Sequence, residues 1–224
     1  MATKTKRIVV FESYWNTPNE NPQVLPFIQA LVNLHQQPKT NSDPKGVVPI
    51  EIVYRTVRTK SDLTYYLSSQ DKNISSNNLL YLASHGIKGF LSFSNNRNEE
   101  EFWISHDEVC NLLEANCKGV FSHIHFAACG YFAGDKTWKK YHEIIKASNA
   151  KYVSGYRENI DWIESMFVDL AYIYYFYING NQQNKSKINN FESSYNELAR
   201  LLGFTICYID SNKNFQFFPI DTTR

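Results

Sequence analysis

Two short stretches decide the fold expected for this chain, NLLYLASHG at residues 78–86 and IHFAACG at residues 124–130. Each is a nearly continuous apolar run that stops at a reactive side chain followed by glycine. Such runs are typical of parallel strands that are buried on both faces of a sheet. The sequence therefore predicts two central strands, with His85 at the carboxyl end of one and Cys129 at the carboxyl end of the other.

Outward from these two stretches, apolar strand patterns alternate with apolar residues at helical spacing. Strands separated by helices imply parallel strands with crossover connections, hence a three-layer α/β fold with a mostly parallel sheet flanked by helices. We find no internal repeat and no linker, so residues 1–224 are expected to form a single domain. The six strands expected in the sheet are 6–12, 50–57, 78–84, 120–128, 151–155 and 204–209. The expected helices are 24–35, 61–69, 105–115, 136–147, 161–177 and 185–202. Segments 89–93 and 101–104 suit a small hairpin, and 215–219 can add an edge strand.

Two of the helix starts carry capping patterns. Ser105 and Glu108 form a capping-box pattern. In a capping box the side chain of each of the two residues accepts the backbone N–H of the other. Asp161 and Glu164 give a similar signature, so Asp161 has a complete structural explanation as an N-cap.

Composition restricts the class of partner. With 23 basic and 22 acidic residues the net charge is +1, too weak a field for a nucleic-acid surface or a polybasic membrane anchor. The longest apolar stretch, Phe167–Ile178, is interrupted by Asp169 and is shorter than the ~20 residues of a membrane span. No stretch resembles a secretory signal. We expect a soluble, cytoplasmic protein that binds neither nucleic acid nor membrane.

The two strand ends carry residues suited to nucleophilic catalysis. A thiolate at Cys129 attacks carbonyl carbon well, and an imidazole at His85 can take the thiol proton and return it to a leaving amine. The backbone amides of Gly86 and Cys129 can point at the developing oxyanion. The four cysteines show no CxxC or Cys/His metal spacing, and without a secretory signal we expect reduced thiols.

The order strand–Ser-His-Gly, then strand–Ala-Cys-Gly, resembles the caspase-like cysteine peptidases. It is most similar to the CHAT family, named for caspase-like domains associated with TPR repeats. The stretch VSGYRENIDWIES at residues 153–165 also resembles that family, which often has a Gly-Tyr turn and an Asp-Trp helix start after its fifth strand. The resemblance covers roughly residues 78–171.

The resemblance implies a caspase-like fold and a cysteine endopeptidase that cleaves a protein substrate through a His85/Cys129 dyad. It implies no metal and no cofactor. It further implies a regulatory protein partner and a bacterial defence or stress pathway, in which a gasdermin-like protein is a candidate target.

The specificity pocket is less well indicated. In many relatives the residue two before the cysteine helps to build that pocket and is often polar or acidic, whereas here it is Ala127. Both signs of charge stand near other strand ends, so no preferred substrate side chain follows. The substrate-binding candidates are Glu12, Ala127, Tyr156, Arg157, Glu158 and, through the resemblance alone, Asp161.

Plainer interpretations stand beside this one. Cys129 can be a buried structural cysteine, and His85 a histidine of an ordinary loop. The chain can then be a catalytically silent caspase-like scaffold. The aromatic stripe at 172–177 is most simply a helix packing face, and its breadth would also suit a partner interface. A nucleotide binder is disfavoured, because neither GxGxxG nor GxxxxGK[ST] follows any expected strand.

Two further histidine patterns raise the question of a metal. His123 and His125 share one face of an expected strand but lack a third ligand, so packing or hydrogen bonding, including support of the dyad's surroundings, is the better interpretation. His106 and Cys110 lie four apart on an expected helix, which we interpret as incidental.

Overall fold

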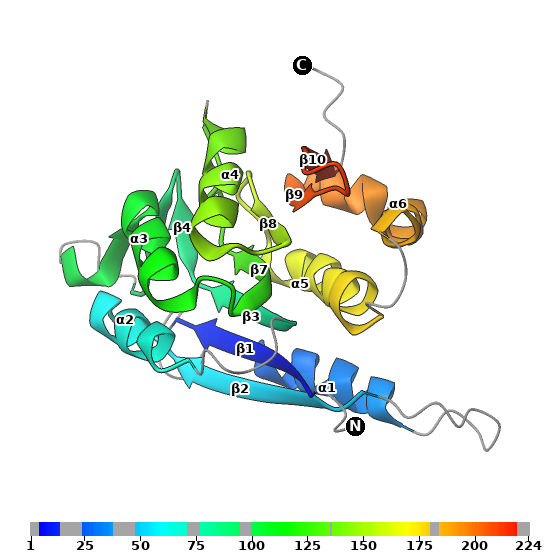
Figure 1. Ribbon diagram of the computed structural model, residues 1–224, viewed down its shortest axis with the longest axis horizontal. Coiled ribbons are helices and arrows are strands. Elements are labelled where there is room, and N and C mark those ends of the chain that lie inside the picture. Colours follow the sequence, from blue (N-terminus) through cyan, green and yellow to red (C-terminus); the bar gives the residue numbers. More distant parts are fainter. Residues whose placement is uncertain are drawn as a thin grey trace.

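The predicted strands lie side by side in the central sheet of the computed structural model (Figure 1). The sheet order is β10-β9-β8-β7-β3-β1-β2. The first five strands of this sheet in chain order, β1, β2, β3, β7 and β8, pair in parallel, whereas β9 and β10 run antiparallel to their neighbours. The prediction of an α/β fold with a mostly parallel sheet is thus confirmed.

The structure describes residues 5–13, 24–37, 48–70, 77–94, 100–134, 136–179 and 184–218, without the side chains of 184–190 and 192. The strands of the main sheet are β1 Lys6–Glu12, β2 Ile50–Thr56, β3 Asn78–Ala83, β7 Phe121–Ala127, β8 Tyr152–Tyr156, β9 Phe204–Ile209 and β10 Phe215–Phe218. A small second sheet holds β4 His85–Ile87, β5 Phe90–Ser92 and β6 Trp103–Ser105, after the 3-10 turn η1 Glu100–Phe102. The helices are α1 Leu25–Gln36, α2 Lys60–Ser68, α3 His106–Cys117, α4 Thr137–Ser148, α5 Trp162–Tyr172, the π-helix η2 Ile173–Ile178 and α6 Asn184–Leu201.

The sheet has seven strands where the sequence predicted six, because the optional edge strand is present. The Asp210 carboxylate accepts the backbone N–H groups of Asn212 and Asn214, which holds a tight turn between β9 and β10. Phe218 is buried at the end of β10. The Asp210 turn and the buried ring of Phe218 are weak indications of a strand in the sequence, yet in the structure they hold β10 as the seventh strand of the sheet.

Two other predictions needed correction. The expected hairpin is a three-stranded sheet, because His85 opens a strand of its own, β4, directly after β3. The expected helix 161–177 is α5 followed by the π-helix η2. In a π-helix the backbone hydrogen bonds join residues five apart in sequence, instead of four apart as in an α-helix. Both capping predictions are confirmed, with a full capping box at Ser105 and Asp161 accepting two N–H groups at the start of α5.

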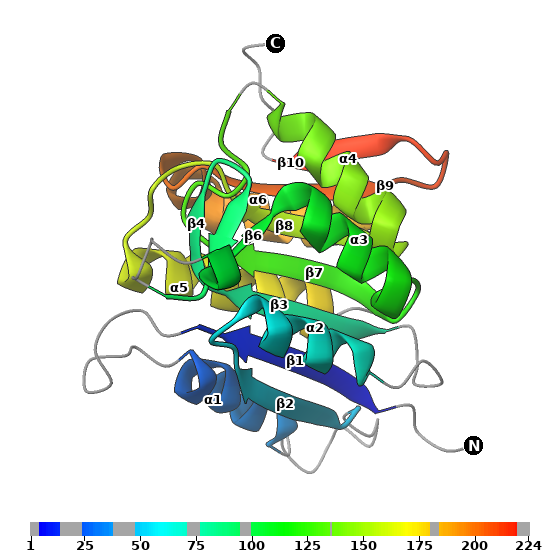
Figure 2. The same cartoon turned by 90° about the vertical axis from the view of Figure 1, so that its left-hand side faces the viewer.

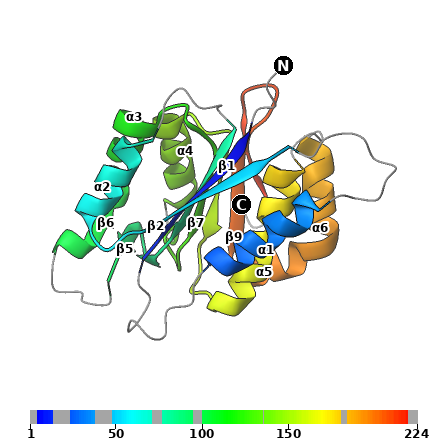
Figure 3. The same cartoon turned by 90° about the horizontal axis from the view of Figure 1, so that it is seen from below.

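Helices cover both faces of the sheet and make two apolar cores. Viewed from below, α2, α3 and α4 lie on one side of the strands and α1, α5 and α6 on the other (Figure 3). Successive residues of a strand point to opposite faces, so Leu80 and Leu82 join the first core while Leu79 and Tyr81 join the second. Every residue of β3 and β7 is buried, which explains their apolar runs.

Figure 2 shows the strand order directly, with β3 beside β7 at the middle of the sheet and α2, α3 and α4 in front. Within the described ranges, no helix is both long and apolar enough to cross a membrane.

Leu80→Ala tests the buried character of the central strand. Leu80 has no exposed surface, so truncation leaves a cavity and should lower the free energy of unfolding by about 2–5 kcal/mol. Leu34→Ala is the matched control, since Leu34 on α1 is 65% exposed and should change stability by less than about 0.5 kcal/mol. Urea unfolding of both variants gives the comparison. Equal losses would contradict this description of the core.

Candidate active site

The pairing of β3 with β7 brings the two reactive strand ends together. The last paired residues are Ala83 and Ala127, and His85 and Cys129 each follow two positions later. The backbone pairing extends one step further, since the N–H of Ser84 donates to the carbonyl of Ala127 at 3.3 Å. Both residues therefore leave the sheet at the same edge, where open α/β sheets bind ligands.

Beyond the sheet, the β4–β5 hairpin runs along the segment that continues from Cys129. The backbone N–H of Lys88 donates to the backbone carbonyl of Gly130 at 3.0 Å, and the N–H of Gly89 donates to the backbone carbonyl of Tyr131 at 2.8 Å. A Cβ atom at Gly86 would stand 2.5 Å from the carbonyl oxygen of Cys129. The glycine after His85 is therefore required for the two backbones to approach this closely.

A second glycine shapes the turn that follows Cys129. Gly130 has φ +53°, a left-handed backbone conformation that residues other than glycine rarely adopt. Its N–H donates to the backbone carbonyl of Glu158 at 2.8 Å. The half-buried Cys129 is a free thiol. Its Sγ donates to the carbonyl of Ile160 at 3.6 Å, so the resting thiol faces the loop that leads into α5.

Two hollows meet at the dyad, and His85 and Cys129 line both of them. The apolar hollow has a volume of ≈ 220 Å³ and is lined by Val24, Tyr81, His85, Ala127, Cys129, Ile160, Trp162, Ser165, Met166 and Asp169. The polar hollow has a volume of ≈ 300 Å³ and is lined by His85, Gly86, Ile87, Ser92, Ser94, Trp103, Cys129 and Asn159. A chain crossing from one hollow to the other would pass the thiol and the imidazole.

One face of α5 forms a wall of the apolar hollow. Trp162, Ser165, Met166 and Asp169 recur at the spacing i, i+3, i+4, i+7, which places them on one side of a helix. The Asp161 side chain fixes where this face begins, because it accepts the N–H groups of residues 163 and 164 at 2.8 and 3.1 Å.

A buried carboxylate lies among these apolar walls. Asp169 is 1% exposed and accepts the hydroxyl of Tyr81 on Oδ2 at 2.6 Å and that of Tyr156 on Oδ1. The Nε2 atom of His125 lies 2.9 Å from Oδ1. Burial, and then the charge of Asp169, raises the pKa of both tyrosines well above the usual range, so both hydroxyls keep the protons that they donate.

The six residues predicted to bind substrate are dispersed. Ala127 lines the apolar hollow, and Tyr156 lies behind it, bonded to Asp169. The other four line neither hollow. Glu12 accepts the N–H of Val24 and the hydroxyl of Tyr54, Arg157 stacks over the ring of Trp138, Glu158 is exposed and Asp161 caps α5.

The histidines of β7 are both structural members of the second core. His123 stacks on Tyr152 with ring centroids 4.6 Å apart, and His125 bonds Ser154 through Nδ1 at 2.8 Å. Within the described ranges, no group of three or more His, Cys, Asp or Glu side chains could hold a metal ion.

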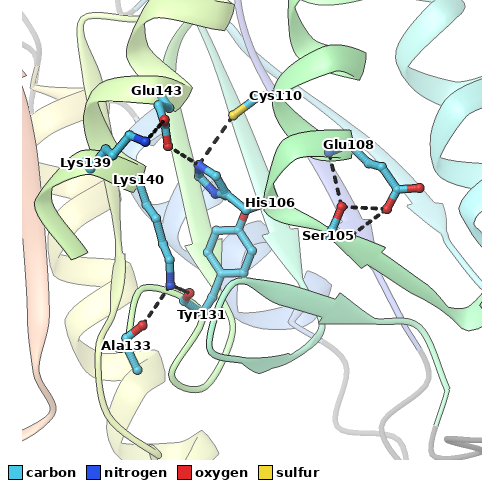
Figure 4. A network of polar contacts seen from close by, with 9 residues as sticks. All are labelled: Ser105, His106, Glu108, Cys110, Tyr131, Ala133, Lys139, Lys140 and Glu143. Carbon is cyan, nitrogen blue, oxygen red and sulfur yellow. Dashed lines mark hydrogen bonds and ion pairs between the residues drawn. The ribbon is translucent and has the colours of Figure 1, made fainter. Parts of the chain in front are cut away.

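The pair His106 and Cys110 does come into contact, in a network behind the nucleophile's loop (Figure 4). The Cys110 Sγ lies 3.5 Å and the Glu143 Oε2 lies 3.2 Å from His106 Nε2. Burial, then the nearby carboxylates, raises the pKa of the Cys110 thiol to about 12. Burial lowers the pKa of His106. A thiol held protonated beside a neutral imidazole is a poor nucleophile.

The same network supports the loop after Cys129. The hydroxyl of Tyr131 lies 2.9 Å from His106 Nδ1, and the Lys140 ammonium donates to the carbonyls of Ala133 at 2.8 Å and Tyr131 at 3.4 Å (Figure 4). The contacts of His106, Tyr131 and Lys140 fix backbone atoms of the turn after Cys129, so we assign these three residues a positioning role. Within the described part of the chain, Cys110 contacts only His106 in this network and makes no bond to the loop.

Sequence reasoning named Tyr156 but missed Asp169 and Tyr81, the other tyrosine that bonds it. One signal was available, since Asp169 is the single charged residue in the apolar run Phe167–Ile178, and a buried acid needs partners. Projecting α5 as a helix from Asp161 would also have grouped Trp162 and Met166 with Asp169.

No protein-family model matches the chain, and the comparison with curated proteins gave no match either.

Alkylation should distinguish Cys129 from the other thiols. Cys117 and Cys207 are fully buried, and Cys110 has its pKa raised to about 12, so its thiolate is scarce at mildly alkaline pH. Limiting iodoacetamide under those conditions, with peptide mapping afterwards, should modify Cys129 first. Equal or faster modification of Cys110 would contradict the assigned geometry.

Lys140→Met tests the supporting network. Loss of the ammonium leaves the Ala133 carbonyl without its donor and the Tyr131 carbonyl with the Gly89 N–H alone. The free energy of unfolding should therefore fall by about 1–2 kcal/mol. Lys139→Met is the control, because Lys139 is exposed and its ion pair is with Glu143 on its own helix, a contact worth less than about 0.5 kcal/mol. If urea unfolding shows the same change in both variants, Lys140 does not support the loop.

Proposed function

We propose that this protein is a cysteine endopeptidase of caspase-like architecture, most similar to the CHAT family. The observation that carries the proposal is the position of the dyad. His85 and Cys129 come after neighbouring paired strands by the same two residues and together line both hollows. A shared strand-end edge with two flanking hollows suits an extended peptide held across a nucleophile and an acid/base.

The chemistry needs only these two side chains and water. His85 takes the proton of Cys129, and the thiolate adds to the scissile carbonyl to form a tetrahedral oxyanion. Collapse of that intermediate breaks the C–N bond, with His85 returning the proton to the leaving amine. Water, deprotonated by His85, then cleaves the thioester, releases the acid product and restores the thiol.

The hairpin register supports an oxyanion role for Gly86. Lys88 and Gly89 have φ +40° and +90°, as in a two-residue hairpin turn. Counting from that turn, residue 87 belongs to a hydrogen-bonded pair and Gly86 to a non-hydrogen-bonded pair with Leu91. The Gly86 N–H is therefore directed away from β5, and we assign it with the Cys129 N–H to the oxyanion.

The biological setting is part of the same proposal and rests on the resemblance. A separate protein would regulate cleavage in the cytoplasm, the pathway would be bacterial defence or stress, and a gasdermin-like protein is a candidate target. Neither nucleic acid nor membrane is a proposed direct partner.

A silent scaffold is the second candidate, favoured by exposed apolar side chains beside the site. Phe27 on α1 is 42% exposed, and Ile163 and Phe167 on α5 are 61% and 60% exposed. Such surface suits a protein partner. The scaffold predicts that Cys129→Ala preserves every biological effect of the protein.

Peptidyl acyloxymethyl ketones and fluorogenic peptide libraries test the protease directly, with candidate partner proteins supplied. The wild-type protein should form a thioether at Cys129, Cys129→Ala should lose labelling and cleavage, and His85→Ala should lower the cleavage rate at least about a hundredfold. Cys110→Ala is the matched control and should keep full activity. Cleavage that survives Cys129→Ala, or wild-type Cys129 that no ketone labels, would sink the proposal.

A further inference from the structure

Asp169, whose side chain is buried, is one of the residues that line the apolar hollow beside His85 and Cys129. An ionised carboxylate has about four acceptor positions. Tyr81 and Tyr156 occupy two of them with hydroxyl protons, and His125 approaches a third with Nε2. One acceptor position on Oδ2 is left over, on a residue that lines the hollow.

His125 can serve Asp169 without neutralising it. The hydroxyl of Ser154 lies 2.8 Å from the other ring nitrogen, Nδ1. If that hydroxyl donates, the imidazole is neutral and presents its one proton at Nε2 toward Asp169. The two tyrosine hydroxyls then orient the carboxylate by hydrogen bonds, and the His125 ring lies beside Oδ1 at 2.9 Å.

The described part of the lining supplies no permanent opposite charge. Among the residues that the structure describes, no lysine or arginine lines the apolar hollow, and none forms an ion pair with Asp169. The walls are the apolar side chains of Val24, Ile160, Trp162 and Met166, with Ala127 adding only a methyl group. Apolar walls that lead to an unneutralised acid match a side chain with a methylene stem and a cationic tip.

Resting on the proposed peptidase function, we propose that the apolar hollow binds the lysine or arginine side chain of the residue whose carbonyl Cys129 attacks, with Asp169 as the specificity determinant. In this proposal Ala127, at the position where relatives often carry a polar or acidic residue, leaves space in the hollow for the substrate side chain. The carboxylate that binds the basic group comes from Asp169 on α5. Selectivity arises because a neutral or acidic side chain would leave the buried carboxylate without its cation.

The test compares four otherwise identical peptidyl acyloxymethyl ketones with lysine, arginine, leucine or aspartate next to the reactive group. The rate constant for alkylation of Cys129 is read by intact-protein mass, and each rate is divided by the leucyl rate of the same protein. In the wild type at least one basic probe should react about tenfold or more faster than the leucyl probe, and the aspartyl probe slowest.

Asp169→Asn should bring the basic-to-leucyl ratio close to one, because it removes the charge and keeps the shape. Asp161→Asn is the matched control, since that acid caps α5 and lines neither hollow, and it should retain the wild-type ratio. The ratio counts only reactive protein, so partial misfolding of Asp169→Asn does not disguise the result. As a second variant, Met166→Lys places an ammonium one turn from Asp169 and should also abolish the preference for basic probes.

The outcomes separate the two proposals. Equal wild-type rates for basic and leucyl probes, or a ratio that Asp169→Asn leaves unchanged, would overturn the inference while Cys129 labelling still supported a protease. No labelling of Cys129 by any of the four probes would overturn the protease and this inference together.

Discussion

The parallel pairing of β3 with β7 is the constraint on which the site depends. The pairing runs to Ala83 and Ala127, so the two strands end side by side. A histidine and a cysteine each follow two positions after the last paired residue. Both strands are buried along their whole length, and a one-residue slip would turn every side chain to the opposite face. Packing in two cores thus fixes where His85 and Cys129 leave the sheet.

The segments just beyond the two strands convert proximity into a defined geometry. The β4–β5 hairpin bonds along the chain after Cys129, and only glycine at position 86 permits that approach. From the far side, Lys140 and Tyr131 tie the same turn to α3 and α4. The pairs His85–Cys129 and His106–Cys110 differ in their surroundings. The first lines two hollows, whereas burial, and then nearby carboxylates, raises the pKa of the Cys110 thiol and keeps it protonated.

The strand ends could be predicted from sequence because a strand buried on both faces has a local signature, an apolar run with a sharp stop. The residues that line the apolar hollow could not be predicted as a group, because they meet only in the folded chain. Tyr81 on β3 and Asp169 on α5 are 88 positions apart and bond across the second core. Arg157 and Glu158 stand at a strand end as predicted, yet there the chain turns toward β9, with the Arg157 N–H bonded to Gly203 and its side chain over Trp138. A position next to a strand end therefore predicts the lining of the apolar hollow less well than a position on the facing side of the following helix.

The most direct measurement is a crystal structure of the protein after reaction with a lysyl acyloxymethyl ketone. The account predicts a thioether at Cys129, a ring nitrogen of His85 close to that sulfur, and the ketone oxygen about 3 Å from the Gly86 amide nitrogen. It also predicts the lysine ammonium against Oδ2 of Asp169. An adduct on another residue, or a Cys129 adduct with His85 turned away from the sulfur, would contradict the account.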